Sequence, residues 1–373
     1  AVTGIIGTNF TFAEDTDVLN DNNVNLEAEV LPYQDTSLSF EERAADLVSR
    51  MTLAEKVNQL GYNTSAISRL GVGKYRYWRE ALHGVGRQGK ATSFPSSLAM
   101  SNTWDRDVIY KAADITSTEA RAKTGTSDNR YDLSYWSPTI NMARDPRWGR
   151  NEESYGEDPY LTSEYGIQFV NGMQGNDDKY LKSISTIKHF VANNCEGERR
   201  YGTSVMDEQT LRDYYTKAFQ NIVEKANPGS LMSSYNATTV TRDGKLLYDY
   251  VPSSANKYTL TDLLRRNWGF SGYVTGDCGA VGLLNSTLAY KRTLFPDVED
   301  LSTIPQSATI PFALVNGNDL DCGSGGDAFQ SNAAQAVENN YMSEDAVDIA
   351  VYHAILTRMK TGEFDISTPY DSL

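Results

Sequence analysis

Residues 184–191 read Ile-Ser-Thr-Ile-Lys-His-Phe-Val, an apolar run with two basic side chains near its end. A longer segment at about 207–226 then carries a helical pattern. The same order returns once more, because the run 229–235 is followed by a helical pattern at about 258–266. Strand-like runs that alternate with helical patterns predict parallel βαβ units.

Outward from this core, the runs 272–275 and 318–322 predict two further strands. The last helical pattern follows Ser343 and repeats Val347, Val351 and Ile355 at helical spacing. The chain has no internal repeat and no linker that would divide it into comparable domains. We therefore expect an α/β fold, a (β/α)8-type TIM barrel with some irregularity.

The N-terminal segment differs from the rest of the chain. Residues 1–36 show little periodicity and many Asn, Asp and Thr, which predicts an extended arm, and the barrel domain is expected over 37–373. Near its start, Ser39 with Glu42 and Thr52 with Glu55 form two S/T-x-x-E patterns. Each pattern is a capping box and predicts the start of a short helix.

Composition narrows the class of ligand. The formal net charge is −15 and the positive charges are scattered, so we expect no nucleic-acid surface. A load of 23 Tyr and 5 Trp is compatible with a neutral ligand such as a sugar. No apolar run approaches the roughly 20 residues that span a bilayer. The chain opens on Ala1, which suits a mature secreted product, extracellular or periplasmic, and suits a trimmed product equally.

The cysteines predict no metal site. Cys195, Cys278 and Cys322 lack the paired short spacing of zinc ligands, so we expect neither a structural metal nor a cofactor. Cys278 and Cys322 each lie near a predicted strand end. This placement allows either one disulfide or two buried thiols.

Polar residues at the predicted strand ends are the candidates for chemistry, because active sites of barrels lie at the C-terminal ends of the strands. Asp277 closes the apolar run Gly272-Tyr-Val-Thr-Gly, although an acid at this place could also cap the following helix. Lys188 and His189 end another run, and Arg199 follows. They could clamp hydroxyl groups, form a structural ion pair, or include a Schiff-base lysine.

Three further clusters are weaker by themselves. The segment 142–153 packs charges of both signs and includes Arg144. Glu80 follows a largely aromatic run, and Met232 and Tyr235 lie around the end of the run 229–235.

Four motifs occur in order: EALHG at Glu80 to Gly84, ARDPRWGRNEESYGEDP at Ala143 to Pro159, KHFVANN at Lys188 to Asn194 and DCGAV at Asp277 to Val281. With them the sequence resembles glycoside hydrolase family 3, and within it the β-xylosidase-like and β-glucosidase-like members. The similarity runs from about Ser39 to Pro369. It implies a retaining exo-acting barrel that removes nonreducing-end β-xylosyl or β-glucosyl residues.

The resemblance also implies roles for single residues. Asp277 corresponds to the nucleophile that forms a covalent glycosyl intermediate. The residues expected around the nonreducing-end sugar are Glu80, Arg87, Arg144, Lys188, His189, Arg199, Met232 and Tyr235. We expect Arg, Lys and His to supply charge-assisted donors, and the nearby cations to hold the pKa of Asp277 low. Glu80 stands where glucose-cleaving relatives commonly have Asp, which favours xylosides.

The chain lacks one expected component. Two-domain members carry the acid/base Glu on a C-terminal α/β sandwich domain, which this chain does not include. Barrel-only members use a loop His, and residues 195–204 contain none. We therefore expect a further domain or a partner chain to supply the acid/base. The alternatives are a catalytically silent carbohydrate-binding barrel and a Schiff-base lyase acting through Lys188.

Overall fold

The computed structural model describes residues 30–124, 131–323 and 327–373. Its centre is a parallel sheet in the order β3-β4-β6-β9. The strands are β3 (Ser134–Tyr135), β4 (Ile184–Phe190), β6 (Ser230–Ser233) and β9 (Tyr273–Gly276). Every residue of β4, β6 and β9 is buried, as expected for strands covered on both faces.

Single backbone contacts extend this sheet towards a ring. Thr275 bridges Leu320, and the next residue, Asp321, bridges Gly61, both in parallel. The short strands β1 (Asn63–Thr64) and β2 (Tyr75–Arg76) then pair antiparallel. The Trp136 amide donates to the Arg79 carbonyl at 2.8 Å, which joins the continuation of β2 to that of β3. The predicted α/β barrel is confirmed, with one antiparallel neighbour among its strands.

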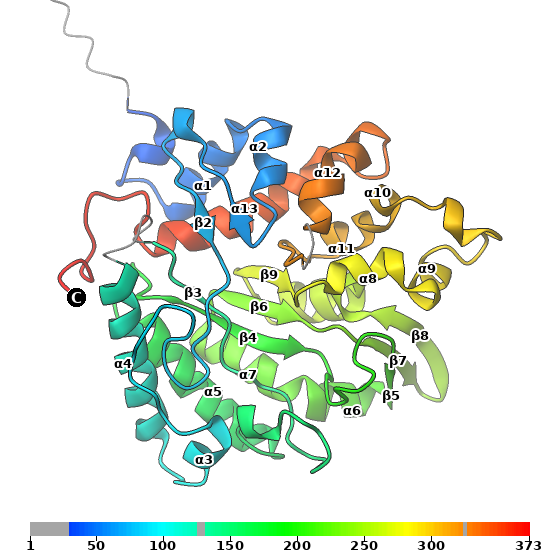
Figure 1. Cartoon of the computed structure of the whole chain (residues 1–373), viewed down its shortest axis with the longest axis horizontal. Helices are drawn as coiled ribbons and strands as arrows, with labels where there is room; N and C mark the ends of the chain where they lie inside the picture. Colours follow the sequence, from blue (N-terminus) through cyan, green and yellow to red (C-terminus); the bar gives the residue numbers. More distant parts are fainter. Residues whose placement is uncertain (1–29, 125–130, 324–326) are drawn as a thin grey trace, which may run out of the picture. The chain divides into compact units, whose positions relative to one another are not determined.

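Helices cover the outside of the sheet. Figure 1 shows α5 and α7 below the parallel strands and α13 above them. The longer helices are α4 (Arg106–Thr124), α5 (Pro159–Gln174), α7 (Lys217–Ala226), α12 (Ala328–Glu338) and α13 (Glu344–Lys360). The shorter ones include α3 (Ser97–Ser101), α8 (Ala280–Ser286), α9 (Leu288–Leu294), α10 (Gln306–Thr309) and α11 (Pro311–Val315). Helix α7 buries Phe219, Ile222 and Val223 along one face.

Local capping signals were reliable. Ser39 and Thr52 cap α1 (Phe40–Ser49) and α2 (Leu53–Asn58), and both capping boxes are complete. Ser343 precedes α13, whose predicted stripe is buried. All three helix starts are confirmed, and those at Ser39 and Thr52 could be read from nearby residues because a capping side chain acts over only three residues.

The start of the compact unit differs from the prediction. It begins at Pro32 rather than at residue 37, because Tyr33 is buried and its hydroxyl donates to the Leu70 carbonyl. Arg43 Nε also donates to the Tyr33 carbonyl at 3.0 Å. The rest of the predicted arm, residues 1–29, lies outside the described residues.

The predicted helix at 207–226 is in fact three pieces. Asp207 caps α6 (Glu208–Thr210), a π-helical stretch η4 (Leu211–Tyr215) follows, and α7 begins at Lys217. The helix predicted at 258–266 is the π-helix η6 (Tyr258–Asn267). Apolar spacing detects a helix here, but it does not detect a change in winding.

A small second sheet was not predicted. It pairs β5 (Thr203–Asp207), β7 (Ala237–Arg242) and β8 (Lys245–Pro252) in the order β5-β7-β8. Asp243 and Gly244 link β7 to β8 and both have positive φ, 51° and 69°. Asp-Gly between two strands is a strong hairpin signal, so this element could have been found from the sequence.

Candidate active site

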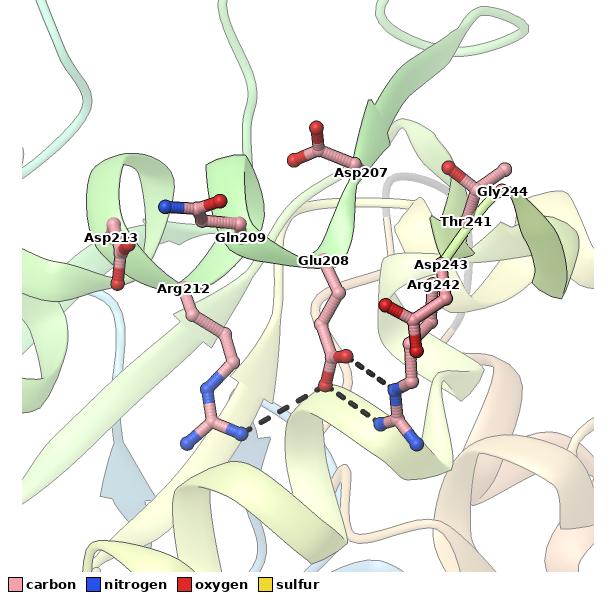
Figure 2. Close-up of a pocket in the computed structure, with 9 residues that line it drawn as sticks. All are labelled: Asp207, Glu208, Gln209, Arg212, Asp213, Thr241, Arg242, Asp243 and Gly244. Atoms are coloured by element: carbon pink, nitrogen blue, oxygen red, sulfur yellow. Dashed lines mark hydrogen bonds and ion pairs between the residues drawn. The ribbon is translucent and has the colours of Figure 1, made fainter.

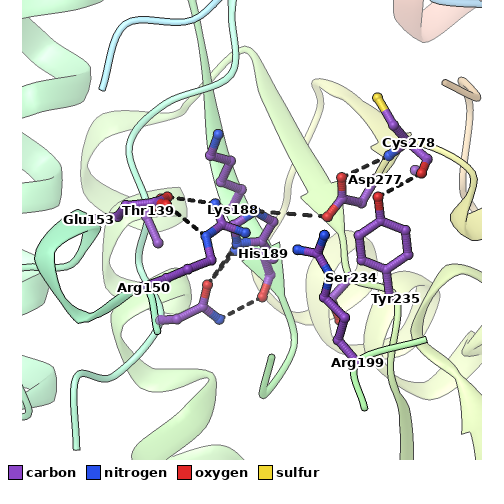
Figure 3. Close-up of polar contacts among 12 residues, drawn as sticks. Thr139, Arg150, Glu153, Lys188, His189, Arg199, Ser234, Tyr235, Asp277 and Cys278 are labelled. Carbon is purple, nitrogen blue, oxygen red and sulfur yellow. Dashed lines mark hydrogen bonds and ion pairs between the residues drawn. The ribbon is translucent and has the colours of Figure 1, made fainter. Parts of the chain in front are cut away.

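Four of the predicted site residues meet at the C-terminal ends of adjacent strands. Lys188 and His189 belong to β4, Tyr235 follows β6, and Asp277 follows β9 directly. Figure 3 shows the His189 ring and the Asp277 carboxylate facing each other, with Tyr235 beside Asp277. A register shift between Ile187 and Phe190 interrupts the ladder at this point. Such irregularities commonly redirect side chains next to active sites.

Within the described residues, Asp277 forms no ion pair with a lysine or an arginine. Its Oδ2 lies 3.9 Å from His189 Nε2, and its Oδ1 accepts a hydrogen bond from the Cys278 amide at 2.7 Å. The Asp277 amide donates to the Ser233 carbonyl, which ties the residue to β6. The side chain is 14% exposed, so one carboxylate oxygen is held while the carboxylate remains accessible.

The expected lowering of the Asp277 pKa is wrong. Burial raises the pKa of Asp277, and the Cys278 amide and the charges of Lys188, Arg150 and Arg199 offset this only in part. The attraction of these cations for Asp277 is weakened because Lys188, Arg150 and Arg199 each pair with another carboxylate. Desolvation of the carboxylate therefore outweighs their attraction.

His189 is held as a neutral imidazole. Burial lowers the pKa of His189 well below its usual value, and Arg150, Lys188 and Arg199 add to the effect. The Asn141 amide orients the residue by donating to the His189 carbonyl and accepting from the His189 backbone N–H, both at 2.9 Å. Its Oδ1 also lies 3.0 Å from Nδ1, which places the proton there. Nε2 is therefore an acceptor, which corrects the expected charge-assisted donor.

Glu80 is fixed from two sides. Trp78 Nε1 donates to its Oε1 at 3.0 Å, and Lys188 Nζ lies 3.2 Å from its Oε2. Trp78 itself stacks on Trp136 with ring centroids 5.7 Å apart. Lys188 is thus occupied by an ion pair rather than presented as the free neutral amine that a Schiff-base mechanism uses.

Arg199 lies over the ring of Tyr235. Its guanidinium carbon is 4.7 Å from the ring centroid, and its NH1 pairs with Glu196 Oε2 at 2.8 Å. The Tyr235 hydroxyl donates to the Cys278 carbonyl at 2.6 Å. Both residues therefore border the segment that carries Asp277.

The charged loop between β3 and α5 contributes a different arginine from the one predicted. Arg144 is exposed and its NH1 donates to Tyr215 at 3.4 Å. Arg150 instead acts on the charges of both His189 and Asp277, and it pairs with Glu153. Sequence reasoning missed Arg150, Glu153 and Asn141, because a loop with several arginines does not reveal which one turns inward.

The two remaining predicted residues occupy different environments. Arg87 lies over the Trp78 ring, with its guanidinium carbon 4.1 Å from the ring centroid. Met232 is 1% exposed and belongs to the cluster of buried side chains that includes Tyr77, Trp136 and Leu320. Arg87 therefore borders the site through Trp78, whereas Met232 packs beneath it.

Cys278, the residue after Asp277, forms a disulfide with Cys322, and Cys195 is free and exposed. The bond closes a loop with a sequence separation of 44, and on the loop-entropy estimate it stabilises the fold by about 4 kcal/mol.

We expect the double variant Cys278→Ala/Cys322→Ala to lose about this much free energy of unfolding in urea titrations. Cys195→Ala is the control, with a change within about 0.5 kcal/mol. Equal midpoints for both variants would contradict a stabilising role.

A separate hollow at the second sheet is made of ion pairs. It has a volume of 580 Å³ and lies between α6, η4 and the tip of the β7–β8 hairpin. Figure 2 shows Glu208 between Arg212 and Arg242, and its carboxylate binds the Arg242 guanidinium at both oxygens. None of the predicted site residues lines it. This surface is therefore distinct from the cluster around Asp277.

Among residues 30–124, 131–323 and 327–373, no helix combines the length and apolar character that crossing a membrane requires. Nor does this part of the chain hold a group of three or more His, Cys, Asp or Glu placed to bind a metal ion.

The fold and the site together define an α/β barrel with a carboxylate centre for a polar ligand. Residues 52–356 match the glycosyl hydrolase family 3 N terminal domain, so this chain belongs to glycosyl hydrolase family 3. Its relatives include the exo-1,4-beta-xylosidase bxlB of Emericella nidulans, 35% identical over 353 residues, covering 90% of this chain and 43% of the relative. A xylan 1,4-beta-xylosidase of Xylanibacter ruminicola is 35% identical, and the match covers 91% of this chain and 38% of that relative.

Solved structures agree with this assignment. The family 3 exo-beta-xylosidase XlnD, in complex with a xylobiose aziridine probe, superposes with a TM-score of 0.80 at 34% identity. The match covers 91% of this chain and 43% of that one. The beta-glucosidase DesR of Streptomyces venezuelae, in complex with D-glucose, has a TM-score of 0.67 at 26% identity. This match covers 88% of this chain and 38% of that one. This chain thus spans less than half the length of these relatives.

Proposed function

We propose that this chain is the catalytic barrel of a retaining exo-acting β-glycosidase that removes nonreducing-end β-xylosyl residues, with Asp277 as the nucleophile. The observation that carries the proposal is the carboxylate at the end of β9, which one amide holds and which pairs with no lysine or arginine among the described residues. It faces an acceptor nitrogen of His189 and lies among cations that have their own counter-ions.

The proposed reaction uses these groups as follows. An Asp277 oxygen attacks the anomeric carbon while the bond to the leaving oxygen breaks, which forms a glycosyl ester. His189 Nε2 accepts a hydrogen bond from a sugar hydroxyl, and Arg150, Arg199 and the Lys188–Glu80 pair hold the others. Water then attacks the same carbon and loses a proton to the group that earlier protonated the leaving oxygen, which breaks the ester bond and returns the free Asp277 carboxylate. Burial of Asp277 makes this anion less solvated and hence more reactive.

The leaving oxygen must receive a proton, and we propose that the donor lies outside this chain, in a further domain or a partner. Glu80, Glu153 and Glu196 are the carboxylates nearest to the cations of the site, and each forms an ion pair. Burial raises the pKa of Glu153, but the hydrogen bonds and charge of Arg150 outweigh it and the pKa is lowered overall. Glu153 is therefore an anion and not a proton donor.

Trapping the covalent intermediate tests the proposal. A dinitrophenyl 2-deoxy-2-fluoro-β-D-xyloside is expected to label the chain once, because its leaving group needs no acid and the fluorine slows the second step. Peptide mapping by mass spectrometry should place the label on Asp277. A label on Glu80 or Glu153 would refute the nucleophile. Reversible binding without any label would favour the silent carbohydrate-binding barrel.

Glu80 is expected to set the preference for xylose. Because Trp78 and Lys188 hold its carboxylate, it cannot turn away from the hydroxymethyl group that glucose adds. We expect kcat/KM for aryl β-xylosides to exceed that for the matching glucosides by roughly 10- to 200-fold. Glu80→Asp should narrow this ratio, whereas the exposed control Glu152→Asp should leave it unchanged. An equal or higher kcat/KM on the glucoside would remove the argument.

A further inference from the structure

Arg150 and Glu153 form the best-defined ion pair of the site. Arg150 Nε lies 2.8 Å from Glu153 Oε1, and NH2 lies 2.5 Å from Oε2, so both carboxylate oxygens engage one edge of the guanidinium. The two side chains are 18% and 19% exposed. An arginine paired along one edge is fixed in the plane of the carboxylate, and its remaining N–H groups point in a defined direction.

The barrel wall anchors this pair. Thr139 Oγ1 donates to Glu153 Oε2 at 3.4 Å, and Thr139 bridges Lys188 on β4. Figure 3 shows Glu153 beside Thr139, with the guanidinium of Arg150 between Glu153 and His189. Glu153 therefore connects a side chain on a loop to the strand that carries Lys188 and His189. Glu153 is the last residue of the short helix η3 (Asn151–Glu153).

Glu153 also limits the charge that Arg150 presents. Arg150 lowers the pKa of both Asp277 and His189, so its field reaches both groups. A carboxylate on its far edge opposes that field. The charged and titratable groups facing Asp277 are Lys188 and His189 on β4, Arg150 near η3, Arg199 after β4 and Tyr235 after β6, with Glu80, Glu153 and Glu196 behind the cations.

We infer that Glu153 is a positioning residue: it orients Arg150 towards the sugar and reduces the positive charge acting on the nucleophile. The inference rests on the proposed function, because it requires Asp277 to be the nucleophile. Glu153 touches neither the sugar nor the anomeric carbon in this role. It acts through Arg150 alone.

The test is a single-turnover measurement on the 373-residue chain with a dinitrophenyl β-xyloside. The rate constant of the phenol burst reports formation of the glycosyl-enzyme, and the burst amplitude counts active sites. The quantity compared is the burst rate constant per active site, divided by the substrate concentration at which that rate constant is half-maximal. We expect Glu153→Gln to lower this ratio by roughly 10- to 100-fold, because Arg150 loses its orientation. The matched control is Glu152→Gln, the exposed neighbour, which should match the wild type.

The pH profile separates positioning from a role in folding. Removing the Glu153 charge leaves the field of Arg150 on Asp277 unopposed, so the pKa of Asp277 should fall. The acid limb of the burst rate should therefore move to lower pH. Glu153→Asp keeps the charge and should slow the burst while leaving that limb in place. This second variant also serves if Glu153→Gln does not fold.

Two outcomes would overturn the inference. The first is a per-site burst rate for Glu153→Gln within twofold of the wild type, with an unmoved acid limb. The second is a change that appears only in burst amplitude and unfolding midpoint, since that marks a structural residue. If the wild-type chain shows no burst and no label on Asp277, the proposed function itself fails, and this result is distinct from either.

Discussion

Asp277→Asn is expected to lose glycosidase activity by roughly 10⁴-fold or more, because it removes the nucleophile and keeps its volume. The Asn Oδ1 can still accept the bond from the Cys278 amide. The measurement is kcat/KM on an aryl β-xyloside after removal of contaminating wild type. The control is Asp297→Asn, an exposed residue in the same half of the chain. Residual activity above about a tenth of the wild type would show that the nucleophile is another residue.

The same variant should be at least as stable as the wild type at neutral pH. Burial raises the folded-state pKa of Asp277 above its unfolded value. A carboxyl with a raised folded-state pKa binds its proton more tightly in the folded state, so ionisation at higher pH destabilises the fold. Asparagine does not ionise and avoids this loss. Unfolding midpoints at neutral pH should therefore separate loss of chemistry from loss of structure.

Xylobiose is expected to be cleaved by this chain alone about 10²- to 10⁴-fold more slowly than an acid catalyst would permit. A sugar alkoxide leaves poorly without a proton, and the nearby carboxylates Glu80, Glu153 and Glu196 are all ion-paired. Dinitrophenyl β-xyloside should still react, with a phenol burst followed by a slow steady rate. Azide should raise that steady rate, because an anionic nucleophile needs no general base.

The xylobiose measurement has a built-in comparison, since both substrates deliver the same glycosyl group to Asp277. Xylose release can be followed by chromatography beside the phenol burst. Turnover of xylobiose at roughly 1–10³ s⁻¹ would mean that the chain contains an acid/base after all. In that event Glu196, which follows β4 in the sequence, would be the first residue to replace.

Features that depend on a few neighbouring residues could be predicted from the sequence. The caps at Ser39 and Thr52 are of this kind, and so is the carboxylate at the end of β9. The sequence could not decide whether Cys278 and Cys322 form a disulfide. It shows that the two cysteines lie at strand ends, but not that those strands are adjacent. The family resemblance added the roles of the residues and not their geometry.

Features that depend on distant packing could not be predicted. Arg144 and Arg150 lie in one charged loop, and the anchoring of Glu153 to Thr139 helps to explain why Arg150 and not Arg144 turns inward. The direction of the Asp277 pKa shift was wrong because a list of nearby cations does not include their counter-ions. The neutral state of His189 likewise follows from burial.

The pairing of three cations in the site with carboxylates has a consequence for the effect of ionic strength on binding. Lys188 with Glu80, Arg150 with Glu153 and Arg199 with Glu196 act as three local dipoles rather than three free charges. The field of a dipole fades with distance faster than that of a single charge, so dissolved ions have little long-range attraction to screen. An uncharged sugar entering this site would displace no counter-ions. Its recognition would therefore stay nearly constant from dilute buffer to concentrated salt.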